Sequence, residues 1–159
     1  MGEDAVRRRD ESRSQERKEK EAENVMADYI ETAMITHALK QSAITAIFGQ
    51  RVFLHVAPER TPLPYVVLNN IAPSNDSEEF GKGRMAQPTL QWDCISTNDK
   101  TPCSAFLGAH AIMDAFANYQ GTMEGVVVKI IWIQGPKTFP LGDGKITSIV
   151  ETFPHYEEP

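Results

Sequence analysis

The strongest constraint on the fold is a change of composition near residue 24. Residues 1–24 contain 15 charged side chains, 7 basic and 8 acidic, and almost no large apolar ones. Such a segment cannot form a core, because burial does not offset the entropy lost on ordering. The core must come from residues 25–159, which hold most of the large apolar side chains. We expect one folded domain there, preceded by a charged extension that is helical or disordered when free.

Charge and cysteine content exclude several classes of protein. The formal net charge is −6, whereas dedicated nucleic-acid binders usually carry a basic surface. No apolar run approaches the roughly 20 residues of a membrane span, and no hydrophobic stretch follows the N-terminal arginines as in a secretory signal. Cys94 and Cys103 match neither a disulfide framework nor a zinc site. We expect them to be small, reduced, partly buried side chains of a protein made in a reducing cytosol.

Hydrophobic periodicity predicts two helices and several strands. The helices are expected over about 25–40 and 103–119, with a short helical turn over 43–48. The second helix should place one apolar face against the core, formed by Phe106, Ala109, Met113 and Phe116. Strands are expected at 51–56, 65–71, 89–97, 126–133 and 145–153.

Two of these strands carry the clearest patterns. Strict alternation in 89–97 places Leu90, Trp92 and Cys94 on one face. Residues 126–133 are almost all apolar, which predicts a central strand, followed by a turn-rich connection over 135–144. The order of elements indicates an α+β fold, a mostly antiparallel sheet of four to five strands packed by two helices.

No pattern in the chain predicts catalysis. His110 and Asp114 lie four residues apart on a helix, a pair that is typically structural. The Gly81–Arg84 segment precedes a strand, whereas a phosphate loop joins a strand to a helix. Gly142–Gly144 predicts a turn, since no spaced carboxylates follow as in a calcium loop. We therefore expect no catalytic, cofactor or metal site, and no enzyme.

One set of sequence motifs is more specific than the patterns considered so far. Ile47-Phe48-Gly49-Gln50-Arg51-Val52-Phe53 leads into His55-Val56-Ala57-Pro58, then into Thr61-Pro62-Leu63-Pro64-Tyr65-Val66-Val67, and later comes the strand Leu90-Gln91-Trp92-Asp93-Cys94. Over about residues 30–156 the chain resembles the tail completion proteins of long-tailed bacteriophages and gene-transfer particles, also called tail terminator or head-to-tail joining proteins. The charged extension is longer than is typical of that family.

The resemblance implies a structural virion protein with an α+β sheet and two helices. Members form a six-fold ring at the head-proximal end of the tail, stop polymerisation of the tail-tube protein and provide the surface that joins the head-tail connector. The implied location is the virion, with assembly in the host cytoplasm. The acidic domain suits a lumen through which DNA passes without specific binding, because like charge discourages adhesion to phosphates. No cofactor and no membrane contact are implied.

Two charged segments are candidates for contacts in such a ring. The polar loop 72–87 is sixteen residues long, and loops of this length are usually functional or disordered. Its charge reverses along the chain, which favours contact with a neighbouring subunit or the tube, although a solvated loop is the alternative. The charged residues are Asp76, Glu78, Glu79, Lys82 and Arg84. The second candidate is the N-terminal arm, with Arg7, Arg8, Arg9, Arg13 and Arg17, or it is a solubilising arm without contacts.

Two other functions stay open at this point. One is a capsid-side connector or head-completion protein, which belongs to the same structural setting. The other, of a different class, is a DNA-contacting module that uses the basic residues of the N-terminal arm, and its binding would weaken steeply with salt.

Overall fold

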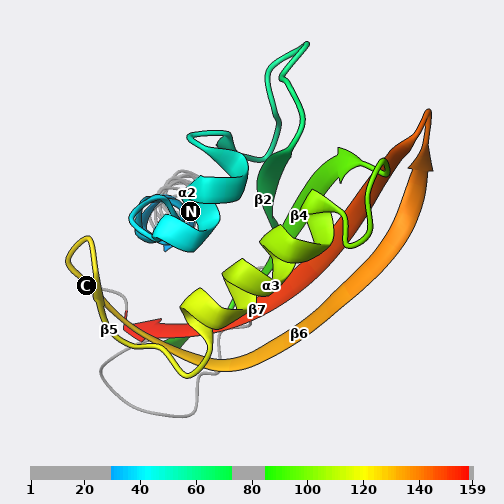
Figure 1. Cartoon of the computed structure of the whole chain (residues 1–159). Coiled ribbons are helices and arrows are strands. Elements are labelled where there is room, and N and C mark those ends of the chain that lie inside the picture. The colour runs from blue at the N-terminus through cyan, green and yellow to red at the C-terminus, as the bar shows by residue number, and fades with distance from the viewer. Residues whose placement is uncertain (1–29, 73–84, 158–159) are drawn as a thin grey trace, which may run out of the picture. The chain divides into compact units, whose positions relative to one another are not determined.

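The computed structural model describes residues 30–72 and 85–157 (Figure 1). Within these ranges a helix occupies residues 30–39, and two further helices follow, α2 (Ser42–Phe48) and α3 (Ser104–Phe116). The strands are β1 (Val52–Leu54), β2 (Tyr65–Ala72), β3 (Met85–Ala86), β4 (Thr89–Thr97), β5 (Gln120–Met123), β6 (Val126–Gly142) and β7 (Lys145–Glu157).

All the described strands belong to one sheet. Its order is β1-β2-β4-β7-β6-β5, and β3 pairs with β7 beside this path. β1 and β2 are parallel, and the other pairs are antiparallel. The α+β class is as predicted, but the seven strands exceed the four to five expected. β3 and β5 were missed because they have only two and four residues, too few for a periodic pattern.

The long β6–β7 hairpin corrects the predicted connection over 135–144. β6 continues for 17 residues through Pro136 and Pro140, both of which lack a backbone N–H donor. They are tolerated because β5 pairs only with Val126–Lys129, so the rest of β6 has β7 on one side alone. The turn is Asp143-Gly144, with φ of 50° and 69°, which suits a two-residue hairpin.

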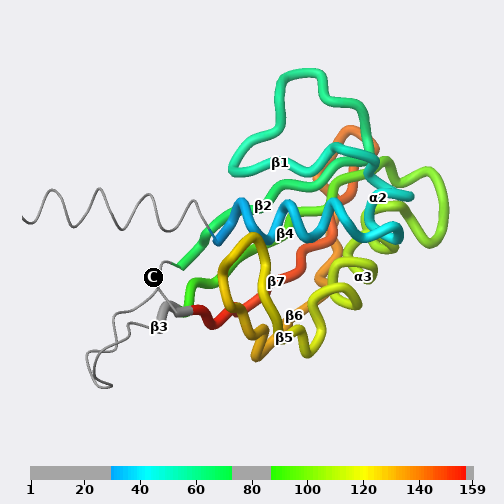
Figure 2. Tube along the Cα trace, turned by 90° about the vertical axis from the view of Figure 1, so that its left-hand side faces the viewer, coloured from blue at the N-terminus to red at the C-terminus, as the bar shows by residue number. Residues whose placement is uncertain are grey.

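The helices lie on one face of the sheet, and α3 sits on the concave side of the curved β6–β7 pair (Figures 1 and 2). α3 contacts β4, β7 and β6. Its buried side is formed by Ala105, Gly108, Ala109, Ile112 and Phe116. The predicted face was therefore partly wrong, since Phe106 and Met113 are only half-buried.

Gly108 explains why the buried side of α3 is shifted. The ring of Phe48, at the end of α2, packs directly against Gly108. A Cβ atom at Gly108 would lie 2.0 Å from Phe48 Cζ, far inside van der Waals contact. The absence of a side chain therefore lets α2 and α3 approach closely, a contact that apolar periodicity does not reveal.

The predicted pattern of β4 is confirmed. The strand spans Thr89–Thr97, and Leu90, Trp92 and Cys94 are all fully buried. The Trp92 indole packs on Phe116 at a centroid distance of 5.3 Å and donates from Nε1 to Thr152 Oγ1 at 3.1 Å. Its single polar atom is thus satisfied within the core.

The Gly-x-Arg-Val and Pro-Tyr-Val-Val motifs meet at one junction. α2 ends at Gly49, whose positive φ of 59° suits glycine. Arg51 Nε donates to the Pro64 carbonyl at 2.7 Å, and Val66 N donates to the Arg51 carbonyl at 3.0 Å. These bonds hold β1 parallel to β2 at the base of the loop 55–64, which projects from the sheet (Figure 2).

Candidate assembly surface

The sheet has one face under the helices and one face without them. Along β6, Val126, Val128 and Ile130 point to the helix side and are buried, whereas Val127 is 63 % exposed. The predicted central strand is confirmed over Val126–Lys129, where β6 lies between β7 and β5, but only one face of this stretch is buried. The apolar run marks a strand with a core face and an open face.

Large apolar side chains gather on the uncovered part of β6. The register shifts between Ile130 and Trp132, so that Ile131 is an extra residue and Trp132 pairs with Phe153 of β7. Trp132 is 63 % exposed. Scattered exposed apolar residues are ordinary, but a series on one strand marks a protein contact surface. The exposed series on β6 is Val127, Ile131, Trp132, Phe139 and Leu141.

The free edge of β6 is not suited to adding another strand. Pro136 and Pro140 lack donors, Lys137 places a charge between them, and the register shifts twice in this stretch. These are the features by which edge strands avoid main-chain pairing. A partner at this edge must therefore be bound mainly through side chains.

A polar cluster lies on the open face of β2 and β4. Asp93 accepts hydrogen bonds from Asn69 Nδ2 at 3.0 Å and from Gln91 Nε2 at 2.8 Å. Burial raises the pKa of the Asp93 carboxyl, and the two amide donors partly oppose this effect. The carboxylate is thus held in place by its neighbours.

A hollow of about 480 Å³ lies between the loop 55–64 and the start of β7. Tyr65 and Leu63 contribute an apolar wall, and the Tyr65 ring meets Phe53 edge-on at 6.4 Å. Arg60 and Lys145 contribute two cations. The other residues that line it are Ala57, Pro58, Glu59 and Thr61.

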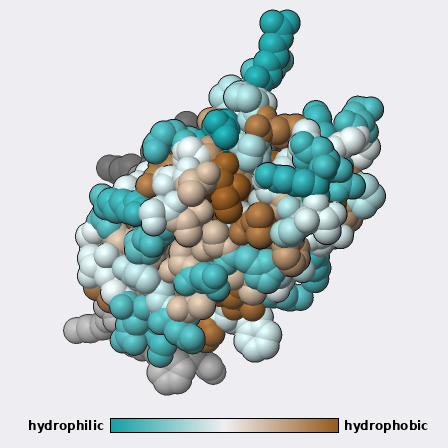
Figure 3. Space-filling view, in the orientation of Figure 1, coloured by the Kyte–Doolittle hydropathy of each residue, from teal (hydrophilic) through white to brown (hydrophobic). Residues whose placement is uncertain are grey.

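The helix side offers a smaller exposed apolar region. Figure 3 shows a band of hydrophobic residues on this side, near the place where α2 and α3 meet. Leu107 of α3 is 42 % exposed. The described part of the chain thus has apolar surface on both sides, with the larger series on β6.

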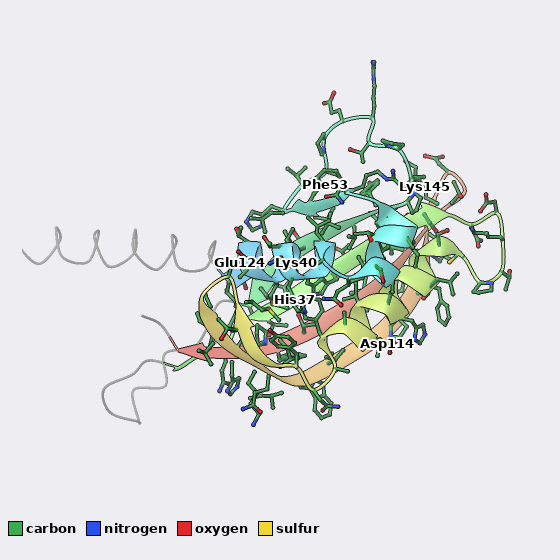
Figure 4. All side chains as sticks on the ribbon, turned by 60° about the vertical axis from the view of Figure 1, so that its left-hand side comes forward. His37, Lys40, Phe53, Asp114, Glu124 and Lys145 are labelled. Atoms are coloured by element: carbon green, nitrogen blue, oxygen red, sulfur yellow. The ribbon has the colours of Figure 1, made fainter. Side chains whose placement is uncertain are left out.

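Lys40 and His37 link the end of the first helix to other elements of the fold. Lys40, just after the first helix, forms an ion pair with Glu124 in the β5–β6 turn (Figure 4). His37 packs against Phe116 at 5.5 Å and Tyr119 at 4.8 Å. Burial lowers the pKa of His37, and the charge of Lys40 adds to this effect.

His155 of β7 has a similar environment. Its Nδ1 lies 3.1 Å from Gln87 Nε2. Burial lowers the pKa of His155, with a further contribution from Lys129 on the neighbouring strand.

The residues considered for chemistry do not converge. His110 packs on Phe106 at a centroid distance of 4.5 Å, and both His110 and Asp114 are exposed. Cys94 and Cys103 are free thiols that are buried, and burial raises the pKa of Cys94. Among the described residues there is no group of three or more His, Cys, Asp or Glu that would hold a metal. No helix in the described ranges is long and apolar enough to cross a membrane.

The charged residues predicted to make contacts lie outside the described ranges. This holds for the loop residues Asp76, Glu78, Glu79, Lys82 and Arg84, and for the arm residues Arg7, Arg8, Arg9, Arg13 and Arg17. The predicted loop 72–87 is too long at its end, because Met85–Ala86 forms β3 and pairs with Tyr156 and Glu157. Sequence reasoning missed the exposed side of β6, although its apolar run was visible.

The described part of the chain is a small α+β domain with a helix-covered core face and an open face that carries exposed apolar side chains, as is typical of proteins that assemble with others. The family model described as tail completion protein gp17 matches residues 32–153, so this chain belongs to that family. The resemblance stated from the motifs is thereby confirmed. The family consists of structural phage virion proteins, and the chain has a structural tail-completion role in a virion, in association with other tail or head proteins.

Two solved structures share the fold. A chain in the virion of a native gene transfer agent particle is 19% identical with a TM-score of 0.61, covering 81% of this chain and 94% of that one. A second solved chain is 16% identical with a TM-score of 0.60, covering 84% of this chain and 96% of that one. No curated protein sequence matches this chain.

Proposed function

We propose that this protein forms a six-fold ring at the head-proximal end of a phage tail, where it ends polymerisation of the tail tube and provides the surface that joins the head. Membership of the tail completion family supports the setting. The observation that carries the ring is the open face of the sheet with its exposed apolar series on β6.

A ring closed by rotation needs two different lateral surfaces on each subunit. The sheet offers two, because β1 with the projecting loop 55–64 lies on one side of the strand order and the free edge of β6 on the other. The sides of the fold that remain, including the exposed Leu107 region, are then available to the tube and the connector.

The charged segments are candidates for further axial or lateral contacts. The arm residues Arg7, Arg8, Arg9, Arg13 and Arg17 are accompanied by a nearly equal number of acids, 7 basic to 8 acidic residues over 1–24, which suits a protein partner better than a phosphate backbone. The loop charges at Asp76, Glu78, Glu79, Lys82 and Arg84 suit a neighbouring subunit or the tube. The net charge of −6 fits a lumen that DNA crosses without specific binding.

Removing the gene and examining the particles by electron microscopy tests this function. We expect tails of abnormal length, or complete tails that do not join heads, because the tube then has no terminating ring. Tails of normal length joined to heads would contradict the proposal. A labelled protein found on the portal instead of the tube end would show a capsid-side connector.

A further inference from the structure

The loop 55–64 projects from the sheet and is anchored mainly at its two ends (Figure 2). None of the residues 55–64 is buried, and Val56 is 74 % exposed. The hollow of about 480 Å³ lies along one side of the loop, so the middle of the loop does not pack closely on the neighbouring strands. The direction of the loop therefore depends on the contacts at its ends.

The end of the loop at Pro64 is held by β1 and β2. Arg51 Nε donates to the Pro64 carbonyl at 2.7 Å, and the Arg51 carbonyl accepts from Val66 N at 3.0 Å. Within the loop, the backbone N and the hydroxyl of Thr61 both donate to the Pro58 carbonyl. These last two bonds shape the tip but do not tie it to the sheet.

The other end of the loop is a strained turn centred on His55. Its φ of 62° lies in the left-handed region, which is unfavourable for a residue with a Cβ atom. Val56 N donates to the Leu54 carbonyl at 2.7 Å and closes a γ-turn over His55. A γ-turn with a positive central φ is the rare, strained form. Such a residue persists only where its surroundings hold it in place.

A buried carboxylate contacts the side chain of this strained residue. Glu31, in the helix over 30–39, is 1 % exposed, and its Oε2 lies 3.4 Å from His55 Nε2. Acidic side chains are almost never fully buried unless they are paired, because burial removes their hydration. The contact thus joins the first helix to the start of the projecting loop.

We propose that Glu31 and His55 form a latch that holds the loop 55–64 in its projecting position. When the latch is closed, the carboxylate holds the imidazole and keeps the His55 backbone in the left-handed turn. When it is open, His55 relaxes to a negative φ and the loop changes direction at this residue, while the Arg51–Pro64 bond still holds the other end. This device belongs to the single subunit and does not depend on the proposed ring.

The latch gives the loop a fixed direction before any partner is met. A surface that is ordered in advance loses less conformational entropy on binding than a mobile one. Residues 57–61 also line the hollow, so opening the latch changes the shape of the hollow as well. The latch therefore determines whether this side of the sheet presents one surface or several.

Amide hydrogen exchange of the purified protein, followed by NMR, tests the latch. Glu31→Gln removes the charge and nearly preserves the size of the side chain. We expect the protection of the Val56 amide to fall by about tenfold or more, because the turn opens locally, while the β4 amides keep their protection. The matched control is Glu124→Gln, which removes an exposed carboxylate paired with Lys40 and should leave Val56 protected as in wild type. Equal protection of Val56 in Glu31→Gln and wild type would overturn the proposal.

Limited digestion with trypsin gives a second readout. Arg60 is exposed in the loop and precedes Thr61, so trypsin can cut this bond when the loop opens. The rate of this cut should rise in Glu31→Gln by the same factor as the loss of Val56 protection, since both follow the population of the open state. A cut at Arg60 as slow as in wild type would contradict the latch.

A double-mutant cycle separates the latch from a general loss of stability. His55→Ala removes the imidazole and should have the same effect on Val56, and the double variant should show no further loss, because both changes break one contact. Additive losses would overturn the latch. If loss of β4 protection shows that Glu31→Gln does not fold, His55→Ala decides alone, and wild-type protection of Val56 in it would overturn the proposal. None of these measurements depends on tail assembly, so failure of the latch leaves the ring proposal standing.

Discussion

The two tryptophans of this chain lie on opposite faces of the same sheet. Trp92 is fully buried on β4 under α3, whereas Trp132 is 63 % exposed on β6. On the helix face the Trp92 ring packs on Phe116 of the same chain, and its Nε1 is satisfied internally by the bond to Thr152. On the open face a similar side chain has solvent on one side. The difference separates residues that fold the subunit from residues available to join subunits.

The largest expected loss of stability follows from a substitution on the helix face. Trp92→Ala should lower the free energy of unfolding by about 3–5 kcal/mol, the usual cost of removing a buried aromatic side chain. Trp132→Ala should change it by no more than about 0.5 kcal/mol, because it leaves no cavity. Urea denaturation followed by circular dichroism measures both. Equal losses for the two variants would break the distinction between the faces.

The next effect concerns the contact of α2 with α3. Gly108→Ala should lower the free energy of unfolding by about 1–3 kcal/mol, because the new methyl group collides with the Phe48 ring. Leu107→Ala, at the neighbouring exposed position, should cost less. A Gly108→Ala protein as stable as wild type would show that this contact is not close.

A pH-dependent effect on the helix face should be smaller. Burial lowers the pKa of His37 below its ordinary value of 6.5, so the unfolded chain binds more protons than the folded one as the pH falls through this value. Stability contributed by neutral His37 is thus present at high pH and lost as the pH falls below about 6.5. The stability difference between wild type and His37→Gln, measured by thermal unfolding, should narrow from pH 8 to pH 5.5. Parallel curves would contradict this assignment.

The smallest effect is expected for the ion pair of Lys40 with Glu124. Both side chains are largely exposed, at 63% and 43%, so water and salt screen their attraction. Lys40→Ala should therefore cost no more than about 1 kcal/mol. Repeating the denaturation at high salt should reduce the difference from wild type, and a loss that persists there would show a role beyond the charge.

The sequence predicted an element well where its own hydrophobic pattern determines its structure. It predicted an element less well where the structure depends on which other strand lies beside it. Alternation alone gave the bounds and buried face of β4. Pro136 and Pro140 instead indicated a connection between strands. A strand can contain these prolines only because β6 has no second neighbouring strand at these positions, which the sequence does not show. Asp143-Gly144 was the local signal for the hairpin turn.

The assembly surface was the hardest part to predict. An apolar run such as 126–133 has the same composition whether both faces are covered or one face awaits a partner. Only the placement of the helices on one side shows that Val127 and Trp132 are uncovered. The family, in contrast, was visible from the motifs around Arg51 and Tyr65, which the structure explains as the junction of α2 with the parallel strands.

Hydroxyl-radical footprinting with mass spectrometry tests the central claim most directly, since it reports the exposure of each tryptophan in the free protein and in purified tails. Trp92 should be protected in both states. Trp132 should be oxidised in the free protein and protected in tails, because a neighbouring subunit covers it. Equal oxidation of Trp132 in both states would contradict the account, since the open face of the sheet would then not be the surface through which this protein assembles.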